Sequence, residues 1–171
     1  MRKLKSLQLN IIRLSFFALF AGFVQATTYH SPEPELFVGT SPCALVMRPL
    51  LSVPTNMDCE MITWNLALTS IPGHESASRF RLKYTYGMSK PGTQGFMNDG
   101  ISGELTGTWS EVKNTGKIPG KSLVSLHTTG QNPPINFAKL DARILHLLDP
   151  QGNLMIGNAA WSYTLGKVKN D

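Results

Sequence analysis

The amino-acid sequence predicts an all-β fold, a small antiparallel β-barrel of about seven or eight strands. Apolar and polar side chains alternate with a period of two in several runs, a pattern typical of half-buried strands. Clusters of Gly, Pro, Asn and Asp separate these runs at short intervals. Many short strands with such turns form a sandwich or a closed barrel. Gly103 and Gly107 favour closure, because glycine on the inward face of a long strand permits the sharp coiling of a small barrel.

The alternation is clearest in Ser78–Gly87, where Phe80 and Leu82 fall on one face and Arg79 and Arg81 on the other. Such a run predicts a strand with one side in the core and one side in solvent. The other expected strands are, in chain order, Phe37–Gly39, Met61–Thr69, Ile101–Ser110, Leu123–Thr128, Ala142–Leu148, Leu154–Gly157 and Ala160–Leu165.

In Ile101–Ser110 both glycines share a face with Leu105 and Trp109, and threonines occupy the opposite face. We expect this face to be inward, with Trp109 in the core. The glycines leave room there for a large ring from a neighbouring strand.

The C-terminal third holds two further expectations. Asp149–Asn153 is rich in turn residues, so we expect a hairpin between the apolar runs Ile144–Leu148 and Leu154–Ile156. Ile135–Leu147 is the best helical candidate, because its apolar residues recur every three or four positions. No window of the chain shows a sustained helical period.

Residues 1–26 have the pattern of a secretory signal peptide. Met1–Lys5 is cationic, Leu14–Val24 is apolar, and Val24 and Ala26 suit the −3 and −1 positions of a cleavage site. The apolar stretch is too short for a spanning helix, which needs about 20 residues. We expect cleavage after Ala26 and a periplasmic or secreted chain with no lipid anchor. An uncleaved membrane anchor is the alternative.

We expect the mature chain to consist of an extended lead-in at residues 27–35 and one barrel domain at residues 36–171. Its charge is nearly balanced: of 16 Lys and Arg in the full sequence four lie in residues 1–26, which leaves 12 against 11 Asp and Glu. The mature chain has no run of basic residues, so we expect neither a nucleic-acid partner nor binding to an anionic membrane surface.

The mature chain has two cysteines, Cys43 and Cys59. In an oxidising compartment an isolated pair usually forms a disulfide, so we expect one here. A pair of free thiols or a metal site is the alternative.

A series of short motifs runs along the mature chain. Residues 37–44 read FVGTSPCA, a second cysteine follows, and an L-x-L pair comes next. The motifs F-x-L-x-Y, G-x-W and L-L-D-x-x-G-x-L then occur in that order, at Phe80–Tyr84, Gly107–Trp109 and Leu147–Leu154. This series resembles the N-terminal domain of the NlpE-type copper-resistance and envelope-stress lipoproteins. The resemblance covers about residues 37–157 and implies a small antiparallel barrel related to lipocalins.

The chain differs from that family at two points. The two family cysteines stand in a C-x-x-C, whereas an insertion separates Cys43 from Cys59. The lipid-bearing cysteine after the signal peptide is missing. The resemblance implies a binding or sensing role in the bacterial envelope, linked to envelope stress or copper.

One soft-metal candidate is present. Met57, Cys59 and Met61 project to one side if the segment is extended, and thioether and thiolate ligands suit Cu(I). Met47 or His30 would be further ligands. The favoured interpretation is that Cys59 is oxidised and the methionines pack in the core. We therefore expect no cofactor, with copper as the minority alternative.

No enzyme motif is present. A Ser/His/Asp set can be composed from Ser125, His146 and Asp149, but no G-x-S-x-G elbow accompanies it. The four histidines lack metal-ligand spacings, and no glycine-rich phosphate loop occurs. We expect a protein that is not an enzyme.

Six aromatic residues are expected at inward positions of several strands. In a closed barrel they either fill the core or line a pocket for a small apolar ligand. These residues are Trp64, Tyr84, Tyr86, Trp109, Trp161 and Tyr163.

Together these observations predict an exported, monomeric, non-enzymatic binding or sensing accessory of the cell envelope. Its partner is an envelope protein or a small apolar ligand. A lipocalin-like carrier of an apolar ligand and a periplasmic enzyme with an unrecognised site are the alternatives.

Overall fold

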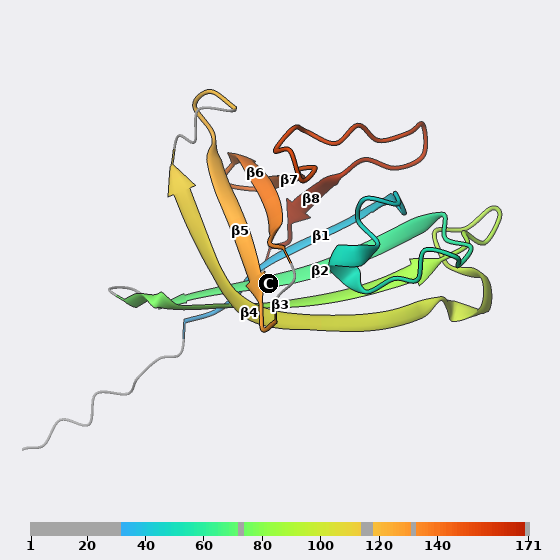
Figure 1. Ribbon diagram of the computed structural model, residues 1–171, viewed down its shortest axis with the longest axis horizontal. Helices are drawn as coiled ribbons and strands as arrows, with labels where there is room; N and C mark the ends of the chain where they lie inside the picture. Colours follow the sequence, from blue (N-terminus) through green and yellow to red (C-terminus); the bar gives the residue numbers. More distant parts are fainter. Residues whose placement is uncertain (1–31, 72–73, 114–117, 131–132, 170–171) are drawn as a thin grey trace, which may run out of the picture. The chain divides into compact units, whose positions relative to one another are not determined.

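The computed structural model describes residues 32–71, 74–113, 118–130 and 133–169, and for residues 74–77 it describes the backbone alone. Within these residues eight strands form a closed antiparallel barrel in which each strand pairs with its neighbours in sequence and β8 pairs with β1 (Figure 1). The strands are β1 (Glu35–Pro42), β2 (Met61–Ile71), β3 (His74–Gly87), β4 (Ile101–Lys113), β5 (Ser122–Thr128), β6 (Ile135–Asp141), β7 (Ile144–Leu147) and β8 (Thr164–Lys167). The predicted all-β barrel is confirmed. The expected signal peptide lies outside the described residues.

Two short 3-10 helices, η1 (Pro49–Leu51) and η2 (Met97–Asp99), lie in connections between strands. Neither is long or apolar enough to cross a membrane, and the same holds for every helix in the described residues.

The long strands β2, β3 and β4 form one side of the barrel. Trp64 of β2 stands opposite Tyr84 of β3, and Leu82 of β3 stands opposite Leu105 of β4. This register places the predicted apolar faces of all three strands on the inside, because residues paired across antiparallel strands share a face. The inward side chains that are buried include Phe37, Ile62, Trp64, Leu66, Leu68, Phe80, Leu82, Val124, Leu126, Ile135, Phe137, Leu145, Leu147 and Leu165.

The two inward glycines of β4 stand where neighbouring groups come close. A Cβ on Gly103 would lie 2.3 Å from Cζ of Tyr84, so the ring occupies the space that a side chain would take. A Cβ on Gly107 would lie 2.0 Å from the carbonyl oxygen of His127 on β5 and 2.9 Å from Cε1 of Phe80. The expectation that these glycines make room for rings of a neighbouring strand is confirmed.

Just after Gly107, β4 leaves β3. The last pair between these strands is Arg79 with Thr108, whereas β4 stays paired with β5 as far as Lys113. In Figure 1, β4 (yellow) curves upward with β5 while β2 and β3 run on together. The barrel wall is therefore split between β3 and β4 beyond this point.

In the C-terminal third the helical candidate is a strand, and two expected strands are wrong in extent. Ile135–Asp141 is the strand β6, not a helical turn, because its alternate residues Ile135 and Phe137 point into the barrel. The expected strand Leu154–Gly157 is reduced to one bridge, between Leu148 and Leu154. The last strand begins at Thr164 rather than at Ala160, since the chain first makes a long excursion outside the barrel.

Candidate functional site

The two ends of the barrel differ. Residues 43–60 connect β1 to β2 and cover one end, which we call the closed end. Cys43 and Cys59 form a disulfide there, with an S–S distance of 1.99 Å and Cα atoms 5.7 Å apart. Within this connection the side chains of Met47, Leu51 and Val53 are buried. The predicted disulfide is confirmed, and it pins the ends of the segment that covers the barrel.

Arg48 holds the covering segment together from within. Only 7% of the residue is exposed, and its guanidinium donates to the carbonyl oxygens of Thr55 at 3.0 Å, Met57 at 2.8 Å and Cys59 at 3.3 Å. Converging carbonyl dipoles offset part of the desolvation cost of the buried charge. The Tyr84 hydroxyl, from inside the barrel, donates to the carbonyl oxygen of Leu51 at 2.6 Å. The closed end is thus a hydrogen-bonded plug.

Three of the soft-metal candidates, Met47, Met57 and Cys59, lie in this plug, and Met61 follows it as the first residue of β2. Cys59 is bonded to Cys43 and offers no thiolate, and Met61 is only 2% exposed. Met57 packs against the core, and Met47 is fully buried. Among the described residues no group of three or more His, Cys, Asp and Glu could hold a metal ion. The remaining candidate, His30, lies outside those residues.

Four of the six aromatic candidates lie inside the barrel. Trp64, Tyr84, Tyr86 and Tyr163 are all buried. The Trp64 ring meets Phe137 edge-on with centroids 6.5 Å apart, and its Nε1 donates to Oγ of Ser41 at 2.8 Å. Burial raises the pKa of the Tyr163 hydroxyl. Burial and then the neighbouring Tyr86 raise the pKa of Tyr84. These rings fill interior space, as the core interpretation expects.

Trp161 is not an interior residue, so that expectation is wrong. It lies outside the strands, in the connection between β7 and β8, and it lines a groove on the outer surface of the barrel. The alternation of Ala160–Leu165 predicted a strand over the whole range, but the strand β8 begins only at Thr164.

Trp109 faces inward as predicted, but it is only half-buried because it stands at the split between β3 and β4. Its Nε1 donates to the carbonyl oxygen of Thr69 at 3.1 Å. A pocket of about 310 Å³ lies beside it, lined by Ser70, Ser78, Trp109, Ser110, Glu111 and Lys113. The tryptophan therefore bridges the split and forms a wall of this pocket.

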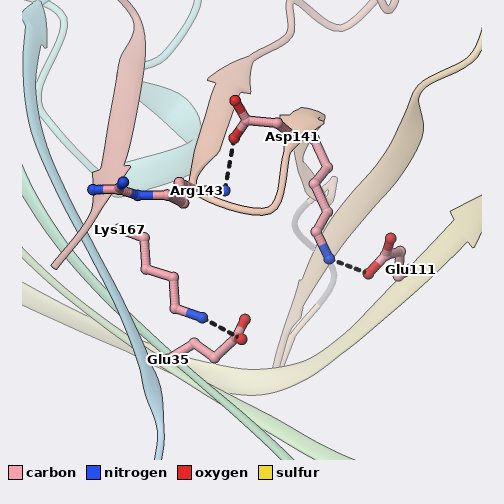
Figure 2. Close-up of polar contacts among 6 residues, drawn as sticks. Glu35, Glu111, Asp141, Arg143 and Lys167 are labelled. Atoms are coloured by element: carbon pink, nitrogen blue, oxygen red, sulfur yellow. Dashed lines mark hydrogen bonds and ion pairs between the residues drawn. The ribbon is translucent and has the colours of Figure 1, made fainter. Parts of the chain in front are cut away.

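The barrel end opposite the plug, which we call the open end, carries charged side chains on inward positions. Lys139 pairs with Glu111 at 2.8 Å, and Lys167 pairs with Glu35 (Figure 2). Each of these four residues stands two positions along its strand from an inward core residue. The open end is therefore polar and its charges are paired. Continuing the alternation of Ile101–Ser110 by one residue would have placed Glu111 on the inward face from sequence.

The electrostatics of Glu111 follow from this position. Burial by itself raises its pKa, but hydrogen bonds from Lys139 and Ser122 and the charges of Lys139 and Lys113 outweigh burial. The pKa of Glu111 is therefore below its ordinary value. The carboxylate is charged at neutral pH and belongs to a structural ion pair.

The groove that holds Trp161, which we call the outer groove, lies on the outward faces of β8, β1 and β2. Its volume is about 510 Å³. Outward threonines of the three strands and Met61 of β2 form its floor, and the connections after β3 and β7 supply the other residues. The lining residues are Thr40, Met61, Thr63, Thr93, Gln94, Ala160, Trp161, Ser162 and Thr164. No local sequence pattern indicates this groove, because its lining comes from four separate segments of the chain.

A third pocket, of about 270 Å³, lies on the outward side of β5 and β6. We call it the apolar pocket, since half of its lining is Ile118, Leu123, Ala138, Leu148 and Pro150. Asn136 lies in its wall and accepts a hydrogen bond from Oγ of Ser125 at 2.8 Å.

The residues of the composed Ser/His/Asp set are engaged separately. Ser125 bonds to Asn136, and both ring nitrogens of His146 are occupied, by Thr164 Oγ1 at 3.0 Å and the Met155 carbonyl oxygen at 2.9 Å. Asp149 accepts from Asn153 within its own turn, and the backbone N–H of Asn153 contributes most to lowering its pKa. The structure does not bring the three together.

The fold and these sites define a small eight-stranded up-and-down barrel with one plugged end and ligand-sized pockets on its outer side. Comparison with known proteins gives no match: no family model fits the chain, and no curated protein or solved structure matches it significantly.

Proposed function

We propose that the protein is an exported, non-enzymatic binding accessory of the bacterial cell envelope. The signal-peptide pattern and the disulfide support export, since disulfides persist in oxidising compartments. The resemblance to the NlpE-type barrel supports an envelope role and links it to stress or copper.

The barrel interior is occupied by its own side chains, and this observation supports a binding site outside the barrel. Trp64 is 3% exposed and packs edge-on against Phe137, and Tyr84 stacks with Tyr86 with centroids 6.3 Å apart. The pockets described above open on the outer side and at the split. A partner is therefore expected on the outer surface.

The engagement of His146 argues against the Ser/His/Asp set as a catalytic site. A general base needs a free ring nitrogen within reach of the proton that it takes. Both nitrogens of His146 already have partners inside the fold. The pKa values of Glu111 and Asp149 are both lowered, whereas a carboxyl acid catalyst needs a raised pKa.

Native mass spectrometry of mature protein isolated gently from its compartment tests this proposal. We expect the chain to carry a non-covalent partner, either a second protein or a small molecule. A chain recovered only alone, both in this measurement and after chemical cross-linking in whole cells, would contradict a binding role. A copper adduct that Cys59→Ser abolishes would instead favour the metal interpretation.

The apolar pocket favours the second candidate, a carrier of a small apolar ligand, with the ligand outside the barrel rather than inside it. A fluorescent apolar dye such as 1-N-phenylnaphthylamine tests this. As a carrier the protein would bind the dye saturably, and Leu123→Gln in the pocket would weaken that binding. Val38→Gln, at an exposed position of β1, is the matched control.

A further inference from the structure

We propose that the outer groove binds a neutral carbohydrate chain, with Trp161 as the aromatic surface on which a sugar ring stacks. This inference rests on the proposed function, because it names the ligand class of a binding protein.

The chemistry of the lining points to a neutral, hydroxyl-rich ligand. None of the nine lining residues carries a charge. Hydroxyls of Thr40 and Ser162 and the amide of Gln94 can both donate and accept hydrogen bonds, as sugar hydroxyls do. The Thr63 hydroxyl donates to the Thr85 carbonyl oxygen at 3.4 Å and can still accept. A phosphate or carboxylate ligand would call for Lys or Arg, and a metal ion would call for His or carboxylates. A lipid chain would call for a mainly apolar lining.

Trp161 supplies the apolar element that a sugar needs. A pyranose ring presents C–H groups on its faces and hydroxyls around its edge. An indole has a broad apolar face and one polar N–H, so it matches the ring face while leaving the hydroxyls to polar neighbours. Met61 also lies in the lining, but it is only 2% exposed, so the apolar contact comes mainly from Trp161.

The backbone around Trp161 is held in place by Asn158. Oδ1 of Asn158 accepts from the N–H groups of Ala160 and Trp161, both at 2.9 Å, and the Asn158 N–H donates to the Trp161 carbonyl at 2.9 Å. A Cβ on Gly157 would lie 2.2 Å from that carbonyl oxygen, so only glycine fits there. The tryptophan is thus presented on a pre-formed turn.

The connection after β3 is organised in the same way. Oγ1 of Thr93 donates to the carbonyl of Lys90 at 3.0 Å and accepts from the N–H of Gly95 at 3.1 Å. The Lys90 N–H donates to the Gly95 carbonyl at 2.9 Å, which leaves Gln94 at the tip of this loop. Groups ordered before binding lose less entropy on binding, so two pre-formed loops favour a ligand site.

The size of the groove fits a short oligosaccharide. Its volume of about 510 Å³ lies within the range of small-molecule sites, roughly 300–1,000 Å³.

Isothermal titration calorimetry of the mature protein with cellotetraose, maltotetraose and chitotetraose tests the inference. We expect saturable binding of at least one of the three. Trp161→Ala should weaken it about tenfold, the size expected for one aromatic contact, and Trp161→Phe should restore most of it. Thr40→Val removes a groove hydroxyl and should also weaken binding. Thr106→Val, at an exposed position of β4 away from the groove, is the matched control.

Three results would overturn the inference. They are absence of binding for all three oligosaccharides, equal weakening by Thr40→Val and Thr106→Val, and unchanged binding in Trp161→Ala. Gln94→Ala, at an exposed loop tip, replaces Trp161→Ala if the latter fails to fold. A non-covalent partner found by native mass spectrometry in a protein that binds no oligosaccharide would leave the proposed function standing and remove this inference alone.

Discussion

The indole Nε1 of Trp109 donates to the carbonyl oxygen of Thr69 at 3.1 Å, across the split where β4 leaves β3. Thr69 belongs to β2, two strands away, so the bond joins parts of the wall that the sheet ladder no longer connects. The ring closes one corner of the barrel that backbone pairing leaves open.

Replacing Trp109 should therefore destabilise the fold. Trp109→Ala removes a half-buried ring and its hydrogen bond, and we expect a loss of about 2–4 kcal/mol in the free energy of unfolding. Trp109→Phe keeps most of the packing and should cost about 1 kcal/mol. Urea unfolding followed by circular dichroism measures both. A Trp109→Ala variant as stable as the parent would show that the bridge contributes nothing.

The disulfide is expected to stabilise the closed end. Fifteen residues separate Cys43 from Cys59, so Cys59→Ser should lower the stability of oxidised protein by about 2–4 kcal/mol. Alkylation without reductant should label neither cysteine of the exported parent. Parent protein assayed in reductant is the control and should approach the variant. Full labelling of both thiols in fresh protein would speak against the bond.

Gly107→Ala should be poorly tolerated, because its Cβ would lie 2.0 Å from a backbone oxygen that cannot move without breaking the β4–β5 ladder. We expect a loss of about 1–3 kcal/mol or more, as for other overpacked sites. Gly166→Ala is the matched control, since a Cβ there meets nothing within 4 Å. Thermal melting of the two variants compares them directly, and equal melting temperatures would refute the steric argument.

Glu111 should make the stability depend on pH in the acid range. Its folded-state pKa lies below the ordinary value of 4.5, so the stabilisation is complete above that value and is lost as the pH falls through the folded-state pKa. Glu111→Gln should cost about 1 kcal/mol at pH 7 and progressively less below pH 4.5.

Chemical unfolding at several pH values measures this difference. Glu104→Gln provides the control, because Glu104 pairs with Arg81 in an exposed bridge, 2.9 Å apart, whose contribution is small. A Glu111→Gln effect that is the same at pH 7 and at pH 3 would contradict the argument.

Export should remove residues 1–26. The intact mass of protein recovered from the periplasm or the medium should correspond to a chain that begins at Thr27. Ala26→Arg, which places a large cation at the −1 position, should block this processing. Full-length parent protein held stably in the inner membrane would refute the prediction.

The amino-acid sequence by itself determined the fold class, the disulfide and the inward face of the long strands. These features depend on local patterns: alternation assigns Phe80 and Leu82 to one face of β3 whatever the rest of the chain does. The two glycines of β4 were likewise recognisable, because an inward glycine in a long strand has few other uses.

Only the tertiary structure decided where the pockets lie. Trp161 shares an alternating pattern with residues that form β8, yet it lies outside the barrel. Its position is set by the path of the connection from β7 rather than by local periodicity. Separate segments of the chain also meet at three other places. Arg48 reaches its carbonyl partners, Trp109 bonds to Thr69, and Thr40 and Gln94 line one groove. Local alternation sets which way a side chain points, but only the closed sheet and its loops set what it meets.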